Sequence, residues 1–344
     1  MKHKLCHFDW SLYRLSKVGQ GLRSGFCLFF QPVIRTRFYQ FILALGIAFA
    51  LFHCLPLMAS AEPLPSFITQ TEAQDFFKWG VDKIQSGNYQ GAIKDFTQAI
   101  QRQADFAAAY SNRCLANIQL GNYQTAIEDC TQAVTLAPNN TEAYLNRGLA
   151  HYKLSNYQAA IEDDNQVIKL NPQEFRGYYN RGVARFVLGN HTKAIVDYNQ
   201  ALRQSPKFPS SVLAEIYNDR GLARFRLSDL KGALADFSQA ISLNANDYRA
   251  YYNRGCVCGR QRNYTAAMRD FTVSLQFNPN NAEAYLNRGI ARYELGYQQL
   301  ALIDLRQAAR LFALQGNTNA YQQTLQFIQA LQQELVSFPE SELG

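Results

Sequence analysis

The strongest constraint on the fold is a sequence pattern that repeats every 34 residues. Residues 107–140 read AAAYSNRCLANIQLGNYQTAIEDCTQAVTLAPNN, and residues 141–174 read TEAYLNRGLAHYKLSNYQAAIEDDNQVIKLNPQE. Seven units carry this pattern, and five extra residues separate the fourth from the fifth; the units are 73–106, 107–140, 141–174, 175–208, 214–247, 248–281 and 282–315. A fixed period of this length indicates one supersecondary element that is copied and stacked along the chain.

Within each unit the pattern predicts two amphipathic helices that pack against each other. In the third unit they span about 142–154 and 157–170, and the second ends before Pro172 because proline cannot continue a helix. Counted from the first residue of each unit, position 4 is aromatic and position 20 is alanine in all seven units, and position 8 is glycine in six. A glycine inside a helix costs about 1 kcal/mol relative to alanine, so its recurrence indicates close helix packing.

The period and the spaced aromatic, glycine, alanine and proline residues, which are Tyr144, Gly148, Ala160 and Pro172 in the third unit, resemble the tetratricopeptide repeat. The resemblance covers residues 73–315 and implies an all-α fold, a right-handed α-solenoid (superhelix) of seven helix-turn-helix repeats. Residues 316–344 are expected to hold a capping helix and a tail. The motifs Y-x-N-R-G-x-A and G-N-Y-Q-x-A-I also resemble repeats that are frequent in cyanobacterial proteins.

Residues 1–61 predict a basic leader, because they carry seven of the basic residues and one acid, +6 of the formal net charge of +7. Residues 38–57 are apolar, and Ala59 and Ala61 fit a signal-peptidase site. Two alternatives stay open: export with cleavage after Ala61, to a periplasmic or lumenal location, or retention as an N-terminal membrane anchor. Residues 62–72 are expected to be a linker.

The remaining net charge of +1 supplies no basic track, so nucleic acid is not an expected partner and an RNA-binding helical repeat is the least favoured function. The sequence shows no phosphate-binding glycine loop, no nucleophile motif and no His or Cys set at metal-ligand spacing. We therefore expect no enzyme activity, no metal and no cofactor. The oligomeric state and the identity of the partner stay open.

The resemblance implies that the first helices of the units line the concave groove. Position 6, on this face, is asparagine in five units and aspartate in one, at Asn112, Asn146, Asn180, Asp219, Asn253 and Asn287. An amide both donates and accepts hydrogen bonds, so these six residues, the position-6 ladder, are candidates for holding an extended peptide backbone. The alternative is that they line a solvated wall or bond a neighbouring unit.

Aromatic residues on the same face are candidates for selecting apolar side chains of a partner, because they give large contact area at low entropy cost. They occupy positions 5 and 12, at Tyr152, Tyr179, Phe186, Phe225, Tyr252 and Tyr293. Packing between repeats is the alternative role. The expected function is therefore a protein interaction scaffold for an extended partner segment, such as an assembly factor for a membrane complex; the alternative is a bilayer-tethered docking receptor.

Two further patterns favour architecture over binding. Position 7 is arginine in six units and position 23 is aspartate in all seven, which predicts repeated bidentate pairs between packed helices that fix their angle. Cys114 and Cys130 occupy positions 8 and 24 of the second unit, so a disulfide between them stays open. Cys256 and Cys258 point in different directions on one helix and are expected to be buried thiols.

Overall fold

The computed structural model describes residues 66–204 and 209–337, and this part of the chain consists of fifteen α-helices and their turns, with no strand. The leader, its cleavage site and the apolar segment 38–57 lie outside the described residues. The helices are α1 (Ser66–Gln85), α2 (Tyr89–Arg102), α3 (Ala107–Gln119), α4 (Tyr123–Leu136), α5 (Thr141–Lys153), α6 (Tyr157–Leu170), α7 (Phe175–Val187), α8 (His191–Gln204), α9 (Ser210–Arg226), α10 (Leu230–Leu243), α11 (Tyr248–Arg260), α12 (Tyr264–Phe277), α13 (Ala282–Glu294), α14 (Gln298–Leu314) and α15 (Thr318–Ser337).

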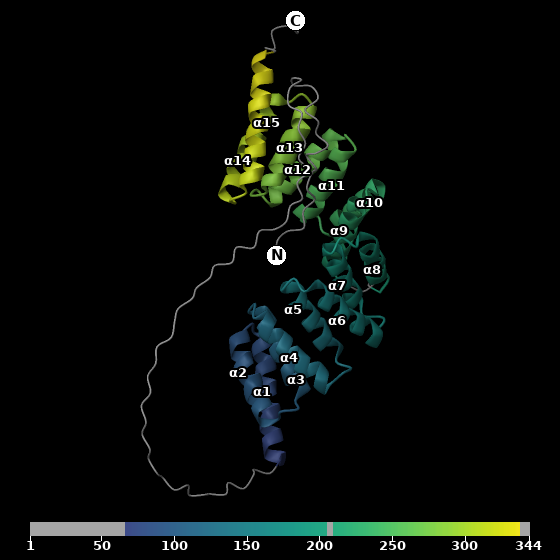
Figure 1. Ribbon diagram of the computed structural model, residues 1–344, viewed down its shortest axis with the longest axis vertical. Coiled ribbons are helices and arrows are strands. Elements are labelled where there is room, and N and C mark those ends of the chain that lie inside the picture. The colour runs from purple at the N-terminus through teal and green to yellow at the C-terminus, as the bar shows by residue number, and fades with distance from the viewer. Residues whose placement is uncertain (1–65, 205–208, 338–344) are drawn as a thin grey trace, which may run out of the picture.

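Consecutive helices pair into units, and the units stack along a curved path from α1 to α15 (Figure 1). Each first helix packs on the second helix of its own unit and on that of the unit before it. The first helices also contact one another along the stack, so they line its inner side. The predicted all-α solenoid is confirmed. Helix α1 begins at Ser66, inside the segment expected to be a linker, and no described helix is long and apolar enough to cross a bilayer.

Three turns within units lack the glycine that the others use. Ser155, Ser228 and Arg262 have φ angles of 66°, 64° and 61°, in the left-handed region that glycine reaches most easily. Four units place glycine there with φ between 75° and 81°, at Gly87, Gly121, Gly189 and Gly296. The backbone of the turn is therefore the same in all seven units, and three of them hold it with a side chain that disfavours it.

Positions 8 and 24 face each other in the middle of every helix pair. A Cβ atom built on Gly182, Gly221 or Gly255 would lie 2.7–2.8 Å from the ring of the residue at position 24, which is Tyr198, Phe237 or Phe271 respectively. Glycine is required here because the ring occupies the space of its missing side chain. In the second unit the same two positions are joined by a disulfide between Cys114 and Cys130, with their Cα atoms 5.5 Å apart.

The predicted arginine–aspartate pairs form in six units and confirm an architectural role. Arg113 donates from Nε and Nη2 to the carboxylate of Asp129, at 3.0 and 2.6 Å, within one helix pair. Its Nη1 donates to Thr97 at position 25 of the preceding unit, at 3.0 Å, and its guanidinium lies 5.5 Å from the ring centre of Tyr110. The arginine–aspartate pair therefore joins the two helices of one unit, and the link to the neighbouring unit comes from the third guanidinium nitrogen. The other pairs are Arg147–Asp163, Arg181–Asp197, Arg220–Asp236, Arg254–Asp270 and Arg288–Asp304.

Helix α15 packs on α14 and closes the C-terminal end of the stack, as a capping helix was expected to do. Leu331 and Phe327 are buried at this contact together with Leu305 and Phe312 of α14. Burying such side chains contributes roughly 1.5–3 kcal/mol each, which compensates for the apolar end that the last repeat would otherwise expose.

Candidate binding surface on the first helices

The position-6 ladder divides into two parts with different surroundings. In the second, third and fourth units, the side chains of Asn112, Asn146 and Asn180 are partly exposed on the inner side of the stack. Asn112 donates from Nδ2 to the carbonyl of Ala108 in its own helix, at 2.9 Å. The amides of Asn146 and Asn180 make no hydrogen bond to any other described residue, so both are open to a ligand.

In the sixth and seventh units the same position is buried and bonds the neighbouring unit. Asn253 is fully buried and donates to Oδ1 of Asn218 in α9, at 3.0 Å. Asn287 is 4% exposed and donates to the hydroxyl of Tyr252 in α11, at 3.0 Å. The amides of Asn146 and Asn180 are therefore open on the inner side, whereas those of Asn253 and Asn287 bond a neighbouring unit, which is the alternative role that the sequence left open.

Between these two parts lies a cluster of tyrosines around Asp219. The hydroxyl of Tyr179 donates to the Asp219 carboxylate at 3.1 Å, and burial followed by the Asp219 charge raises the pKa of Tyr179 well above its usual value. Burial, then Tyr157 and Asp219, raises the pKa of Tyr152. Tyr198 belongs to the same cluster: its ring centre lies 6.1 Å from that of Tyr179, and burial strongly raises its pKa.

The other aromatic candidates are placed differently. Tyr152 and Phe186 are partly exposed, whereas Tyr252 is fully buried and Phe225 is 6% exposed. The hydroxyl of Tyr293 donates to Glu334 of α15 at 2.9 Å, so the capping helix engages this residue. Three candidates are partly exposed and make no contact with the capping helix. They are Tyr152, Phe186 and Tyr179.

The histidines and free thiols of the described residues are held inside the repeats. Burial lowers the pKa of His151 and of His191, and it raises the pKa of Cys258 to about 11, which leaves that thiol protonated and unreactive at neutral pH. Cys256 and Cys258 are buried free thiols. Within residues 66–204 and 209–337, no group of three or more His, Cys, Asp or Glu side chains is arranged to hold a metal ion.

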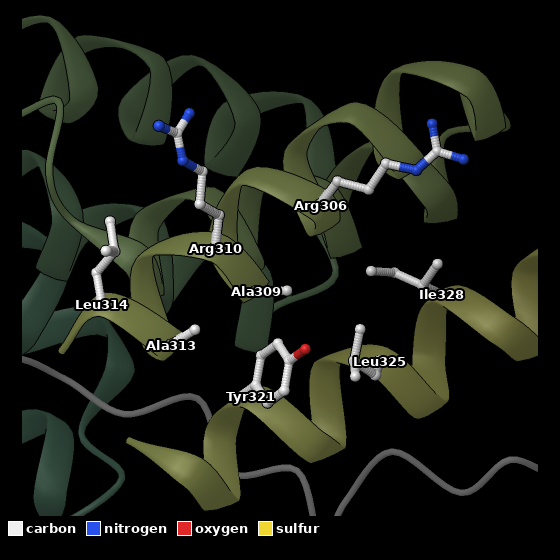
Figure 2. A pocket seen from close by; sticks show the side chains of 8 residues that line it. All are labelled: Arg306, Ala309, Arg310, Ala313, Leu314, Tyr321, Leu325 and Ile328. Atoms are coloured by element: carbon white, nitrogen blue, oxygen red, sulfur yellow. The ribbon is translucent and has the colours of Figure 1, made fainter. Parts of the chain in front are cut away.

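Sequence reasoning missed an open cavity of about 490 Å³ at the C-terminal end of the stack (Figure 2). It lies between α14 and α15 and is lined by Arg306, Ala309, Arg310, Ala313, Leu314, Tyr321, Leu325 and Ile328. The apolar residues of α15 are covered in part: Ile328 and Leu331 are buried, whereas Tyr321 and Leu325 are partly exposed beside the cavity. The sequence signal of this difference is Arg306, which stands at position 25, where every other unit has threonine, serine or asparagine.

Comparison with known proteins agrees with this architecture. A family model described as Tetratricopeptide repeat matches residues 145–209 and 218–276, and a second with the same description matches residues 107–140. No curated protein sequence matches the chain.

Among solved structures, a tetratricopeptide repeat protein from Parabacteroides merdae is similar with a TM-score of 0.57 and 18% identity, over 74% of this chain and 99% of that chain. The structure described under the functional characterization of Pseudomonas aeruginosa pilF gives 0.56 and 18%, over 63% and 95%. The APC/C hetero-tetramer Cut9-Hcn1 gives 0.56 and 20%, over 67% and 46%. At these identities the likeness concerns the fold. Residues 107–140, 145–209 and 218–276 therefore match tetratricopeptide repeats, and the described helices stack into an α-solenoid.

Proposed function

We propose that this chain is a non-enzymatic scaffold that holds an extended segment of a partner protein along the inner side of its first helices. The observation that carries the proposal is the pair of amides of Asn146 and Asn180. Both amides are partly exposed, and neither makes a hydrogen bond to another described residue. They occupy the same position in neighbouring units. Each amide offers a donor and an acceptor, which matches the paired N–H and C=O groups of an extended backbone.

Aromatic side chains on the same first helices as the amides supply the contact with the partner's own side chains. Tyr152 follows Asn146 on α5, and Phe186 follows Asn180 on α7, each by six residues. Their exposed ring surface would bury apolar side chains, and Asp219 next to Tyr179 would favour a nearby basic residue in the bound segment. The binding region is therefore assigned to the third and fourth units, where Asn146 and Asn180 are open, with Asp219 of the fifth unit at its edge.

The test uses the full chain with a photo-crosslinking residue at Tyr152 to identify the bound segment, whose affinity is then measured as a synthetic peptide. We expect Asn146→Ala with Asn180→Ala to weaken binding at least about tenfold, because several backbone hydrogen bonds are lost at roughly 0.5–1.5 kcal/mol each. The matched control is Asn139→Ala with Asn246→Ala, which removes two exposed asparagines in turns. Unchanged affinity in a folded Asn146/Asn180 variant would contradict the proposal.

The location of the scaffold follows from the leader. The basic residues before position 38 and the apolar segment 38–57 support export to a periplasm or lumen, or tethering to a membrane there. A chain in that place is suited to assist the assembly of a membrane complex, and a tethered form would act as a docking receptor. Sequencing the N-terminus of the mature protein tests this: a start at Glu62 supports release, and a start before residue 38 supports the anchor.

A further inference from the structure

Helix α15 has the sequence pattern of a first helix, and within residues 66–204 and 209–337 no second helix of its own unit packs on it. Its residues Ala320-Tyr321 match the Ala-Tyr pair found at positions 3 and 4 in four of the seven first helices, for example Ala143-Tyr144 in α5 and Ala284-Tyr285 in α13. In this alignment Tyr321, Leu325 and Ile328 fall at positions 4, 8 and 11. The chain thus begins an eighth unit with α15.

In the complete units, positions 4, 8 and 11 face the second helix of the same unit. At position 8, Gly221 lies directly under the ring of Phe237, and at position 11, Arg224 pairs with Asp236 at 2.8 Å. At position 4, the ring of Tyr251 stacks on that of Phe277, with their centres 6.4 Å apart. Since all three contacts are made with a helix, the face is shaped to pack against a helix.

On α15 this face borders the open cavity instead (Figure 2). Tyr321, Leu325 and Ile328 form one wall, and Ala309, Ala313 and Leu314 of α14 form the other. Leu314 is 74% exposed, the largest exposed fraction of any large hydrophobic side chain in the part of the chain that the structure describes. The cavity is therefore an apolar groove between two helices, and we call it the end groove.

The charge of the end groove indicates what fits it. Position 25 carries a hydrogen-bond acceptor in the first six units, and each accepts a bond from the arginine at position 7 of the next unit; Arg288 bonded to Thr272 is one such pair. In the seventh unit this arrangement is reversed, with Arg306 at position 25 and the buried Thr324 at position 7 of α15.

Arg310 lies one helical turn after Arg306 on the same side of α14 (Figure 2). Neither arginine makes an ion pair or hydrogen bond with any described residue, and both are exposed. Two unpaired guanidinium groups one turn apart match two carboxylates one turn apart on a facing helix.

We propose that the end groove binds an amphipathic helix of a partner protein, whose apolar stripe is flanked by acidic residues, in the place that the second helix takes in the complete units. The apolar stripe packs on Tyr321, Leu325 and Leu314, and the acidic flank pairs with Arg306 and Arg310. This site lies on α14 and α15, away from the open part of the position-6 ladder, so it does not depend on the proposed peptide groove.

The experiment measures binding of two fluorescent 18-residue helical peptides to the full chain by anisotropy. Both peptides carry leucines at every third or fourth residue; one has glutamate on the flanks of this stripe and the other has lysine. We expect the glutamate peptide to bind at least about tenfold more tightly at low salt, since opposite charges pair at the rim. Arg306→Glu with Arg310→Glu should reverse this preference, and Leu314→Asp should weaken both peptides.

Arg226→Glu with Arg269→Glu is the control, because it changes the charge equally at exposed arginines on α9 and α12. Asn146→Ala with Asn180→Ala should leave peptide binding unchanged, which separates this site from the proposed function. Equal binding of both peptides to the native chain and to the Arg306/Arg310 variant would overturn the proposal. A dimer that the same variant dissociates in sedimentation would make a second copy the occupant. Tighter peptide binding after removal of residues 338–344 would make the chain's own C-terminal segment the occupant.

Discussion

The second and third units have the same backbone and different chemistry at its centre. Positions 8 and 24 are Cys114 and Cys130 in the second unit, joined by a disulfide. In the third unit they are Gly148 and Asp164, and the Asp164 carboxylate is buried, with its Oδ1 lacking a hydrogen-bond partner. Other units place an aromatic ring at position 24, such as Phe237.

The comparison shows that the fold of a unit does not depend on the residues at positions 8 and 24. It is set by the contacts that flank this central pair. Both units hold their helices together with the same elements: the alanine at position 20, the arginine–aspartate pair and the turn. The central pair then changes the stability of the unit without changing its geometry. We expect the second unit to be the more stable of the two and the third to be the less stable.

The largest effect is expected from removing the disulfide. Replacing Cys114 and Cys130 by alanine should lower the free energy of unfolding of the second unit by about 3 kcal/mol, the chain-entropy value for a loop of this length. Hydrogen exchange of the amides in α3 and α4, with and without a reducing agent, measures it. Cys256→Ala serves as the control, because it removes a thiol that forms no disulfide: protection of α3 and α4 in this variant should equal that in the native chain and should fall on reduction in the same way. Equal protection in the reduced and oxidised native chain would show that the bond does not stabilise the unit.

A smaller gain of about 2 kcal/mol near pH 7 is expected from Asp164→Phe, which gives the third unit the ring that other units use. Burial, and then the neighbouring Asp163 charge, raises the pKa of Asp164 well above its usual value. The unfolded chain therefore releases this proton at lower pH than the folded chain does, so stability falls as pH rises above about 4 and levels off above the raised pKa.

Asp164→Asn tests the charge separately from the ring. Denaturant unfolding between pH 4 and pH 8 should show a smaller decrease of stability with pH in this variant than in the native chain. If the native chain and the Asp164→Asn variant had the same pH dependence, Asp164 would not be protonated in the folded chain at neutral pH.

The smallest effect is expected at the junction of the two units. Arg147 donates from Nη1 to Thr131 at 3.3 Å, and this contact is exposed. Thr131→Val should therefore cost only about 0.5 kcal/mol. Thr97→Val removes the shorter, part-buried bond at 3.0 Å between the first and second units and should cost more. Urea unfolding of both variants measures the difference, and a larger loss for Thr131→Val would mean that exposure does not weaken this link.

The repeat period was sufficient to predict the helices, their pairing and the arginine–aspartate contacts, because these depend on residues at fixed positions within one unit. The roles of Asn146 and Asn253 could not be separated from sequence. They occupy the same position, and their exposure depends on how closely neighbouring first helices approach. Burial of the Asn253 amide is possible because it donates a hydrogen bond to Asn218, at position 5 of the preceding unit. The end groove was missed because the stripe on α15 has the same period whether or not a helix covers it.

The bond from position 7 to position 25 also bears on how such a chain grows or shortens by duplication and loss of repeats. Because each internal unit supplies an arginine to the unit before it and an acceptor to the unit after it, a whole internal unit can be inserted or deleted and every guanidinium still finds an acceptor. A complete unit inserted after residue 315 would instead bring its own arginine against Arg306. Insertion or loss of an internal unit would therefore keep the bond from position 7 to position 25 at every junction, whereas an insertion after residue 315 would set two guanidinium groups against each other.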